Sequence, residues 1–309
     1  MDLAAASLSP LPGGWSGQMF LAEVAGERSV VRVYAGPGGG PGGGPGGGQR
    51  RGADAEVDAS LLRLVRGLVP VPDVLELKRA DAATGMPALL VTSYLPGVRG
   101  DLLLPDLDEA GRRTLGRHLG VLVADLGGMP QLEAGPFVDA TLRVGRWEGY
   151  ADGLAELVGA APLDHLSPVE REGLAAVAEE VQALLDTVTR RVLVHGDLSP
   201  GNLLVDPATL AVTGLVDWEL AHAGHPFADL GSLLRFERDP AFTAAVLEAY
   251  AERRGTPPDR ALALARAADL WALVDLAGRR DRDPVAARAD RLLRVVARSR
   301  DAAAWDPDV

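Results

Sequence analysis

The sequence predicts an α+β protein in which a small antiparallel sheet near the N-terminus precedes a larger, mainly helical part. Three observations support this class. Short strand-forming runs lie before position 97, at residues 30–34 and 88–93. After position 97, apolar residues recur at helical spacing in three long stretches. Between those stretches, residues 192–217 alternate short apolar runs with polar turns, which indicates a second group of strands.

The N-terminal segment predicts a hairpin followed by a strand. Residues 11–24 (LPGGWSGQMFLAEV) hold a Gly-rich turn between residues that can pair, and residues 30–34 (VVRVY) form a short β-branched strand. Alternation along this strand places Arg32 on the face opposite Val31 and Val33. The Gly/Pro repeat that follows, within residues 36–50, has no side chains to bury and is predicted to be a flexible insertion.

A helix is predicted over residues 53–68, where Val57, Leu61, Leu64 and Leu68 follow at spacings of four, three and four. The next strand is ALLVTS at residues 88–93, and Tyr-Leu-Pro-Gly at residues 94–97 ends it. Three later helices are predicted from apolar stripes. These are Leu115, Leu119, Leu122 and Leu126; Leu174, Val177, Val181 and Leu184; and Ala263, Ala267, Leu270, Val274 and Ala277.

Residues 192–217 carry the most specific chemistry of the chain. Asp197 and Asn202 lie on one predicted loop, and Asp217 ends the last strand of the stretch. Two carboxylates and a carboxamide are hard oxygen ligands, which suit Mg²⁺ with a nucleotide's phosphates better than they suit zinc. Asp197 and Asn202 also have the D-x-x-x-x-N spacing of the catalytic loop of protein kinases. The stretch therefore predicts phosphoryl transfer.

The motif H-G-D-L-S-P-G-N, followed by a predicted strand and the sequence V-D-W-E, resembles the aminoglycoside and macrolide phosphotransferase family. The resemblance covers most of the chain and implies a bilobal, protein-kinase-like fold that acts on small molecules. It implies that Asp197 is the catalytic base, that Asn202 and Asp217 hold Mg²⁺, and that His195 braces the loop. Asp229 would support the catalytic loop from beneath.

The resemblance also assigns roles in the N-terminal part. The Gly-rich turn, with Gly13, Gly14, Ser16 and Gly17, would fold over the nucleotide phosphates, because glycine lets backbone N–H groups approach them closely. Arg32 stands where protein kinases place a lysine on the third strand, and an arginine can bind phosphate with two parallel hydrogen bonds.

Glu56 is assigned as the partner of Arg32, with Asp54 and Asp58 as alternatives. Ser93, Tyr94 and Leu95 would form the hinge that binds the nucleotide base. The lobe boundary then falls near Gly97, which gives a nucleotide-binding N-lobe over residues 1–97 and a catalytic, acceptor-binding C-lobe over residues 98–309.

Composition narrows the partners. The net charge of −12 argues against binding nucleic acid and leaves room for a cationic ligand, although acidic surfaces often serve solubility alone. The chain has no cysteine, no signal-peptide pattern and no membrane-spanning run, so we expect a cytoplasmic protein without a membrane partner. The sequence does not distinguish between a monomer and a dimer as the oligomeric state.

The predicted activity is transfer of the γ-phosphoryl group of ATP or GTP to a small-molecule hydroxyl. The resemblance favours an antibiotic acceptor, aminoglycoside or macrolide, and Trp147 and Tyr150, on a predicted helix, would be either core aromatics or part of its pocket. A metabolite kinase for a sugar, amino alcohol or amino acid and a non-catalytic nucleotide-binding pseudokinase remain alternatives. A peptide kinase is disfavoured, since the 12 positions between Asp217 and Asp229 leave no room for a long activation loop.

Overall fold

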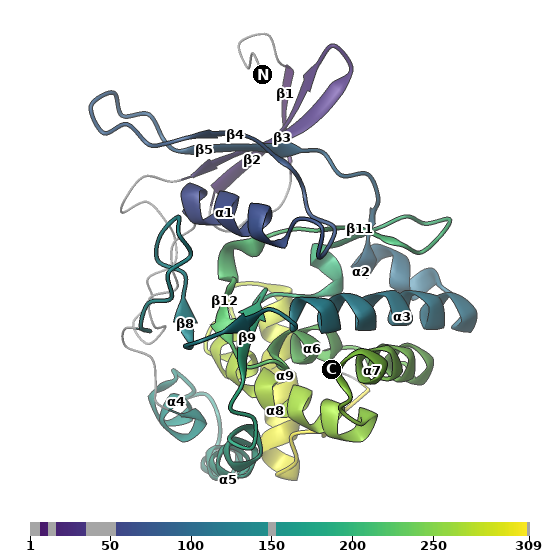
Figure 1. Ribbon diagram of the computed structural model, residues 1–309. Coiled ribbons are helices and arrows are strands. Elements are labelled where there is room, and N and C mark those ends of the chain that lie inside the picture. Colours follow the sequence, from purple (N-terminus) through teal and green to yellow (C-terminus); the bar gives the residue numbers. More distant parts are fainter. Residues whose placement is uncertain (1–6, 12–16, 35–53, 148–152, 308–309) are drawn as a thin grey trace.

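The computed structural model describes residues 7–11, 17–34, 54–147 and 153–307 (Figure 1). The strands are β1 (Ser7–Pro10), β2 (Gly17–Val24), β3 (Glu27–Tyr34), β4 (Val74–Lys78), β5 (Leu89–Ser93), β6 (Val98–Arg99), β7 (Pro130–Gln131), β8 (Gly135–Pro136), β9 (Arg191–Val194), β10 (Leu203–Val205), β11 (Val212–Leu215) and β12 (His222–Gly224). The α-helices are α1 (Ala55–Val65), α2 (Gly100–Leu103), α3 (Glu109–Leu126), α4 (Leu154–Ala160), α5 (Pro168–Leu185), α6 (Ala228–Leu234), α7 (Pro240–Arg254), α8 (Pro258–Ala277) and α9 (Pro284–Ser299). The 3-10 turns are η2 (Leu104–Asp106), η3 (Pro200–Asn202) and η4 (Trp218–Leu220).

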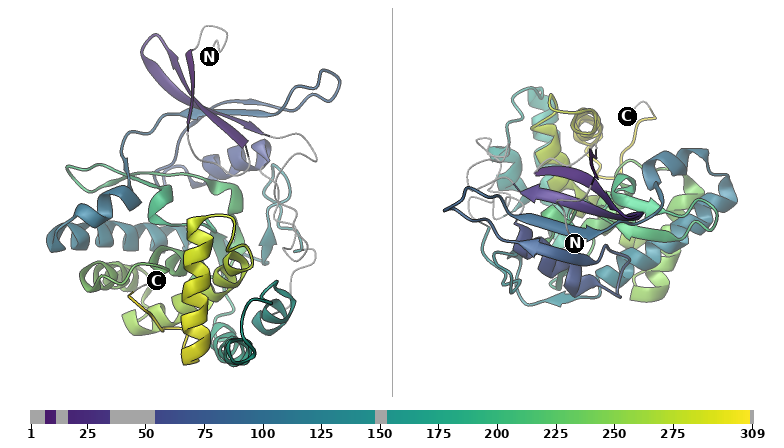
Figure 2. Two further views of the ribbon diagram at one scale, coloured as in Figure 1. Left: turned by 180° about the vertical axis from the view of Figure 1, so that it is seen from behind. Right: turned by 90° about the horizontal axis from the view of Figure 1, so that it is seen from above.

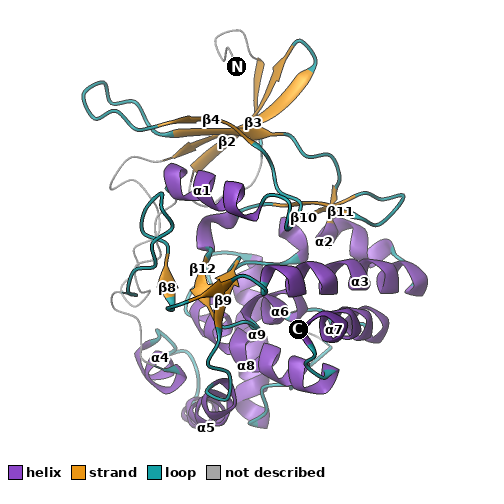
Figure 3. Ribbon diagram, in the orientation of Figure 1, coloured by secondary structure: helices purple, strands orange, loops and turns teal. Residues whose placement is uncertain are grey.

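The molecule has two lobes, as the sequence predicts. In the described residues, the N-lobe holds an antiparallel sheet of five strands in the order β1-β2-β3-β5-β4, with α1 beneath it (Figure 1). In the part of the C-lobe that the structure describes lie the other helices and two smaller sheets, β11-β10-β6 and β7-β9-β12-β8. The view from behind shows the same separation of the large sheet from the helices, and in the view from above the sheet lies over them (Figure 2). Colouring by secondary structure shows that strands dominate one lobe and helices the other (Figure 3).

Strand β3 faces two different environments, and this fixes the direction of Arg32. Val31 packs with Ala22 and Val91 in a small apolar cluster on one face of the sheet. Tyr34, on the face that alternation gives to Arg32, belongs to the main hydrophobic core. The sequence-based prediction that Arg32 lies opposite Val31 is therefore confirmed, and the arginine points toward α1 and the C-lobe.

Helix α1 begins where Asp54 accepts hydrogen bonds from the N–H groups of Glu56 and Val57, at 2.9 and 3.2 Å. The helix is shorter than predicted, and its apolar face is partly different. Leu64 and Leu68 are 42% and 39% exposed, so their place in the predicted stripe is wrong. Val57 and Leu61 are fully buried, and the stripe continues through Leu62 and Val65 instead. Val65 is also the last residue of α1, so Leu68 lies outside it.

The chain passes from one lobe to the other between β5 and β6. Strand β5 pairs with β3 and β4 in the N-lobe, whereas β6 pairs with β10 in the C-lobe. At Gly97, φ is +144°, and an added Cβ would lie 2.7 Å from the Thr213 hydroxyl, so the crossing needs a glycine at this point. A boundary near Gly97 stays a prediction, as do the domain limits derived from it.

The C-lobe helices follow the predicted stripes with two corrections. The four leucines predicted for α3 are buried, and so are most of the residues predicted for α5 and α8. Ala263 is exposed, and Leu264 takes its place toward the core. Trp147 lies in a loop, so its predicted helix is wrong at that position, and Tyr150 falls outside the described residues. None of the helices in the described part is long and apolar enough to cross a membrane.

A buried carboxylate joins α5 to α9. The Glu170 side chain is 5% exposed; it accepts a hydrogen bond from the Ser167 N–H at 2.7 Å and another from Arg298 Nε at 2.9 Å. Arg294 Nη1 lies 3.5 Å from the same carboxylate. Burial raises the pKa of Glu170, but the hydrogen bonds from Ser167 and Arg298 and the charge of Arg294 outweigh it and lower the pKa to about 2.

We expect Glu170→Gln to lower the free energy of unfolding at pH 7 by roughly 1–3 kcal/mol, because the buried carboxylate loses its charge-assisted interactions with Arg294 and Arg298. The depressed pKa means that the carboxylate stabilises the folded state above about pH 4.5. The difference between wild type and variant should then shrink as the pH falls from 4.5 toward 2. Urea unfolding across this range measures it. The matched control is Glu172→Gln, since Glu172 is 72% exposed and pairs with Arg300 at the surface; an equal loss in both variants would contradict the prediction.

Candidate active site

The antiparallel pairing of β10 with β11 brings the predicted catalytic residues together. Leu203 pairs with Leu215, so Asn202, just before β10, lies beside the residues just after β11. The Val216 N–H donates to the Asn202 carbonyl oxygen at 3.0 Å, which places Asp217 next to Asn202. The Asn202 amide nitrogen donates to the main-chain oxygen of Asp197 at 2.8 Å and to its Oδ2 at 2.9 Å.

His195 braces this loop from the inside. Its side chain is fully buried; Nε2 contacts the Val216 carbonyl oxygen at 3.0 Å, and Nδ1 accepts the Asp197 N–H at 3.2 Å. Burial lowers the pKa of His195 to about 4, so the ring is neutral at pH 7 and Nε2 carries its proton. The edge of the ring also packs against Trp218, with 4.7 Å between centroids. These contacts fit the bracing role that the sequence assigns to His195.

Asp229 supports the same loop from beneath. Its Oδ2 accepts the His195 N–H at 2.8 Å, and its Oδ1 accepts the Gly196 N–H at 3.0 Å. Burial raises the pKa of Asp229 to about 6, against the lowering effect of these two bonds. Gly196 has φ +84°, and a Cβ there would lie 2.3 Å from the Leu220 carbonyl oxygen. The loop therefore requires glycine at this position, and Asp229 has the supporting place expected of it.

Arg32 reaches this loop from the N-lobe. Its Nη1 lies 3.5 Å from Asp217 Oδ1 and 3.9 Å from Asp58 Oδ2, and its Nη2 donates to Glu219 Oε2. Only 12% of the Arg32 side chain is exposed. Burial by itself lowers the pKa of Arg32, but Tyr34 and the surrounding carboxylates outweigh it and the pKa is raised. The guanidinium is thus charged and lies at the junction of the two lobes.

The predicted pairing of Glu56 with Arg32 is wrong. Glu56 lies near the start of α1 at the surface, where its carboxylate accepts from Arg79 Nε at 2.5 Å. Asp58, an alternative considered from the sequence, is buried near Arg32, and its Oδ2 accepts the Tyr34 hydroxyl at 2.8 Å. Two positions along a helix turn the side chain by about 200°, so Asp58 faces the site while Glu56 faces solvent.

Glu219 is the site residue that sequence reasoning missed. It lies in η4, two positions after Asp217, and its side chain is 14% exposed. The sequence V-D-W-E could have indicated it, because this motif places a second carboxylate two positions after the predicted metal ligand. Asp217 has a left-handed backbone with φ 66°, unusual for a residue other than glycine, and this turn brings both carboxylates toward Arg32.

The site has an excess of negative charge. Burial raises the pKa of Asp217, and the charges of Glu219, Asp197 and Asp58 raise it further; Arg32 counteracts them, and the result is about 6. Among the described residues, no hydrogen bond reaches the Asn202 side-chain oxygen, while its amide nitrogen is held by Asp197. A charged oxygen and a fixed neutral oxygen beside surplus carboxylate charge fit a hard divalent cation such as Mg²⁺.

The predicted nucleotide-binding residues of the N-lobe are only partly described. Gly13, Gly14 and Ser16 lie outside the described residues, as does the Gly/Pro insertion, while Gly17 begins β2 opposite Tyr34 of β3. In the predicted hinge, the Ser93 hydroxyl accepts the Asp73 N–H at 2.9 Å, and the Arg28 guanidinium lies 4.0 Å from the centre of the Tyr94 ring. Leu95 contacts β11 at Gly214, so the hinge segment reaches the C-lobe.

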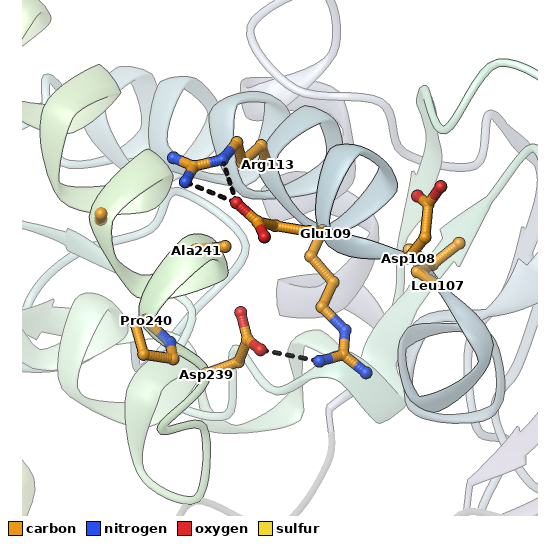
Figure 4. A pocket seen from close by; sticks show the side chains of 9 residues that line it. Leu107, Asp108, Glu109, Arg113, Asp239, Pro240 and Ala241 are labelled. Atoms are coloured by element: carbon orange, nitrogen blue, oxygen red, sulfur yellow. Dashed lines mark hydrogen bonds and ion pairs between the residues drawn. The ribbon is translucent and has the colours of Figure 1, made fainter.

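A pocket of about 460 Å³ opens elsewhere, between the N-terminal ends of α3 and α7 (Figure 4). Arg112 pairs there with Asp239 at 2.7 Å, and Arg113 pairs with Glu109 at 2.8 Å. None of the residues predicted for catalysis lines it, and both of its arginines already pair with carboxylates. We therefore do not place the reaction there.

Comparisons with known proteins found a matching family model, similar enzymes and a similar fold. A family model described as "Phosphotransferase enzyme family" matches residues 7–267. The streptomycin 3''-kinase of Streptomyces griseus is 30% identical over 270 residues, 81% of this chain and 93% of the kinase. The aminoglycoside 3'-phosphotransferase of Streptomyces fradiae is 30% identical over 197 residues, 60% of this chain and 67% of that enzyme. The GDP complex of aminoglycoside 2'-phosphotransferase-IIIa has the same fold, with a TM-score of 0.66, 19% identity, and coverage of 96% of this chain and 94% of that one.

Proposed function

The chain belongs to the phosphotransferase enzyme family, and we propose that it transfers the γ-phosphoryl group of ATP or GTP to a hydroxyl of an aminoglycoside. The observation that carries this proposal is the convergence of Asp197, Asn202 and Asp217 on one side of the lobe junction with Arg32 on the other. Phosphoryl transfer needs mainly positioning and charge stabilisation, and this arrangement supplies both.

Asp197 is the residue for the acceptor hydroxyl. Its main-chain oxygen and Oδ2 are fixed by Asn202, and its N–H is held by His195. Among the described residues no hydrogen bond reaches Oδ1, which leaves that oxygen for the incoming hydroxyl. Asp197 would orient the hydroxyl and take its proton as the oxygen attacks.

Asn202 and Asp217 are the residues that would hold Mg²⁺, because their oxygens and the surplus charge around them fit that ion. When bound, Mg²⁺ neutralises charge on the phosphate oxygens. Arg32 adds a permanent positive charge on the N-lobe side, where it offsets charge on the β and γ oxygens. The Gly13 to Gly17 turn and residues 93–95 would cover the phosphates and bind the base. The reaction uses nucleoside triphosphates, so we propose the cytoplasm as its location.

The acceptor class is supported by the relatives and by charge. Both curated relatives compared above are named for phosphorylation of aminoglycosides or streptomycin, over 60% and 81% of this chain. Aminoglycosides are polycations, and the chain has a net charge of −12, which favours their approach. We therefore place aminoglycosides before macrolides and metabolic alcohols as acceptors.

A thermal-shift screen tests this function. The protein is heated with ATP or GTP plus Mg²⁺, and then with aminoglycosides, macrolides and small metabolic alcohols. A ligand at a hundred times its dissociation constant should stabilise the folded state by about 2.7 kcal/mol, which raises the melting temperature by a few degrees. We expect a nucleotide and at least one aminoglycoside each to raise it.

Other outcomes would redirect the proposal. If a macrolide or a metabolic alcohol raises the melting temperature and no aminoglycoside does, the proposed acceptor class is wrong. The proposed kinase chemistry would be unaffected by that result. The absence of a shift with either nucleotide would contradict the kinase proposal itself and favour a protein without phosphotransfer activity.

A further inference from the structure

The guanidinium of Arg32 joins the two lobes through carboxylates on different elements. Arg32 belongs to β3 of the N-lobe sheet, whereas Asp217 and Glu219 follow β11 in the C-lobe. Nη2 donates to Glu219, while Nη1 donates a long hydrogen bond to Asp217 Oδ1 at 3.5 Å and lies 3.9 Å from Asp58 Oδ2. The contact with Glu219 is the closest of the three, and both partners are largely buried, with 12% and 14% of their side chains exposed.

This arrangement suits an arginine better than a lysine. The two terminal nitrogens of a guanidinium point in different directions within one plane, so one nitrogen can bind Glu219 while the other faces Asp217. A lysine ends in a single ammonium nitrogen, so it cannot present a separate nitrogen to each of the two carboxylates. The arginine at position 32 and the glutamate at position 219 therefore fit each other.

The helix of the N-lobe does not supply an equivalent partner. Glu56 binds Arg79 at the surface, away from Arg32. Asp58 is at the right face of α1, but its Oδ2 already accepts the Tyr34 hydroxyl and lies 3.9 Å from Nη1, beyond hydrogen-bond distance. Among the described residues, the closest carboxylate contacts of the guanidinium thus come from the C-lobe.

We propose that Glu219 is the positioning residue for Arg32: it holds the guanidinium at the lobe junction and keeps its hydrogen bond to Asp217 long, at 3.5 Å. Without the Glu219 charge, the nearest carboxylate to Arg32 among the described residues is Asp217, 3.5 Å away. An arginine bound closely to Asp217 would neutralise the carboxylate that is proposed to hold Mg²⁺. Its guanidinium would also lie too far from the nucleotide phosphates to offset their charge. The inference rests on the proposed function, because it concerns how the same site is aligned.

The test compares Glu219→Gln with Glu56→Gln, a matched control on the glutamate first assigned to this role. Glutamine keeps the size of the side chain and removes its charge. We expect Glu219→Gln to lower kcat by about tenfold to a hundredfold, since misplacement of a positioning group by about 1 Å costs on that order. The nucleotide dissociation constant, measured by calorimetry with Mg²⁺, should change less than about threefold, and Glu56→Gln should match wild type in both values. Glu219→Asp, which keeps the charge, should recover part of the lost kcat.

A double-mutant cycle separates positioning from a general structural effect. If Glu219 positions the arginine, Arg32→Lys should lower kcat strongly in the wild-type background and much less in Glu219→Gln, because the contact is already gone. Equal losses in both backgrounds, or a kcat of Glu219→Gln equal to that of Glu56→Gln, would overturn the inference.

Failure of the inference is distinguishable from failure of the proposed function. If the wild-type enzyme binds nucleotide and phosphorylates an acceptor while Glu219→Gln behaves like the control, only the role of Glu219 is wrong. If wild type neither binds Mg²⁺-nucleotide by calorimetry nor transfers phosphate, the proposed function is wrong, and the positioning role is overturned with it.

Discussion

Replacement of Asp197 by alanine is expected to lower kcat by about a thousandfold, while the nucleotide dissociation constant changes little. General-base catalysis typically contributes factors of about 100 to 10,000, and the alignment of the attacking hydroxyl is lost with it. Asp197 does not contact Arg32 in this structure, so the phosphate side of the site should survive the change. Steady-state kinetics and calorimetric titration with nucleotide measure the two effects separately.

The control for this variant is Asp164→Ala, an exposed aspartate in the loop before α5. Its melting temperature and kcat should equal those of wild type. Full activity of Asp197→Ala would remove Asp197 from the mechanism. A large loss of nucleotide affinity in that variant would indicate that the loop had moved and that the acceptor hydroxyl is not the main partner of Asp197.

Asp217→Asn is expected to lower kcat/KM by about a hundredfold or more at low Mg²⁺ concentration, because a neutral amide is a much weaker ligand for a hard cation. The free protein should be no less stable than wild type. Burial and neighbouring carboxylates raise the pKa of Asp217 to about 6, so its charge destabilises the folded state that lacks a cation. Substitution of a residue that serves function rather than stability typically lowers turnover and leaves the protein as stable as wild type.

Two measurements check this expectation. Titration of activity with Mg²⁺ should show that the variant needs more of the ion for half-maximal rate, and the melting temperature in the presence of a chelator should match or exceed that of wild type. Unchanged Mg²⁺ dependence would contradict the assignment of Asp217 as a metal ligand, whatever the effect on stability.

Residues close in the sequence were predicted well, because their geometry depends on one local unit. Asp197 and Asn202 are five positions apart on one loop, and Asp217 follows a strand that pairs directly with the strand after Asn202. The pairing of β10 with β11 is enough to bring all three together. The supporting role of Asp229, which came from the family resemblance, agrees with its bonds to the N–H groups of His195 and Gly196.

The partner of Arg32 was not predictable in the same way. Arg32 and Glu219 are separated by 187 positions and lie on different lobes. Their contact depends on how the lobes pack and on the left-handed turn at Asp217, neither of which a local pattern specifies. The inward-facing side of α1 was also not predictable from the sequence. The spacing of apolar residues predicted that Glu56 and Leu64 face inward, whereas the packing of the helix buries Asp58 and Val65.

The most direct measurement is phosphoryl transfer itself. The purified protein is incubated with Mg²⁺, ATP or GTP, and a panel of aminoglycosides, and the acceptors are then weighed by mass spectrometry. We predict that at least one aminoglycoside gains the mass of a single phosphoryl group, that nucleoside diphosphate forms in equal amount, and that Asp197→Ala forms neither. Nucleoside diphosphate formed with no phosphorylated acceptor, or acceptors that remain unmodified with both nucleotides, would contradict the account.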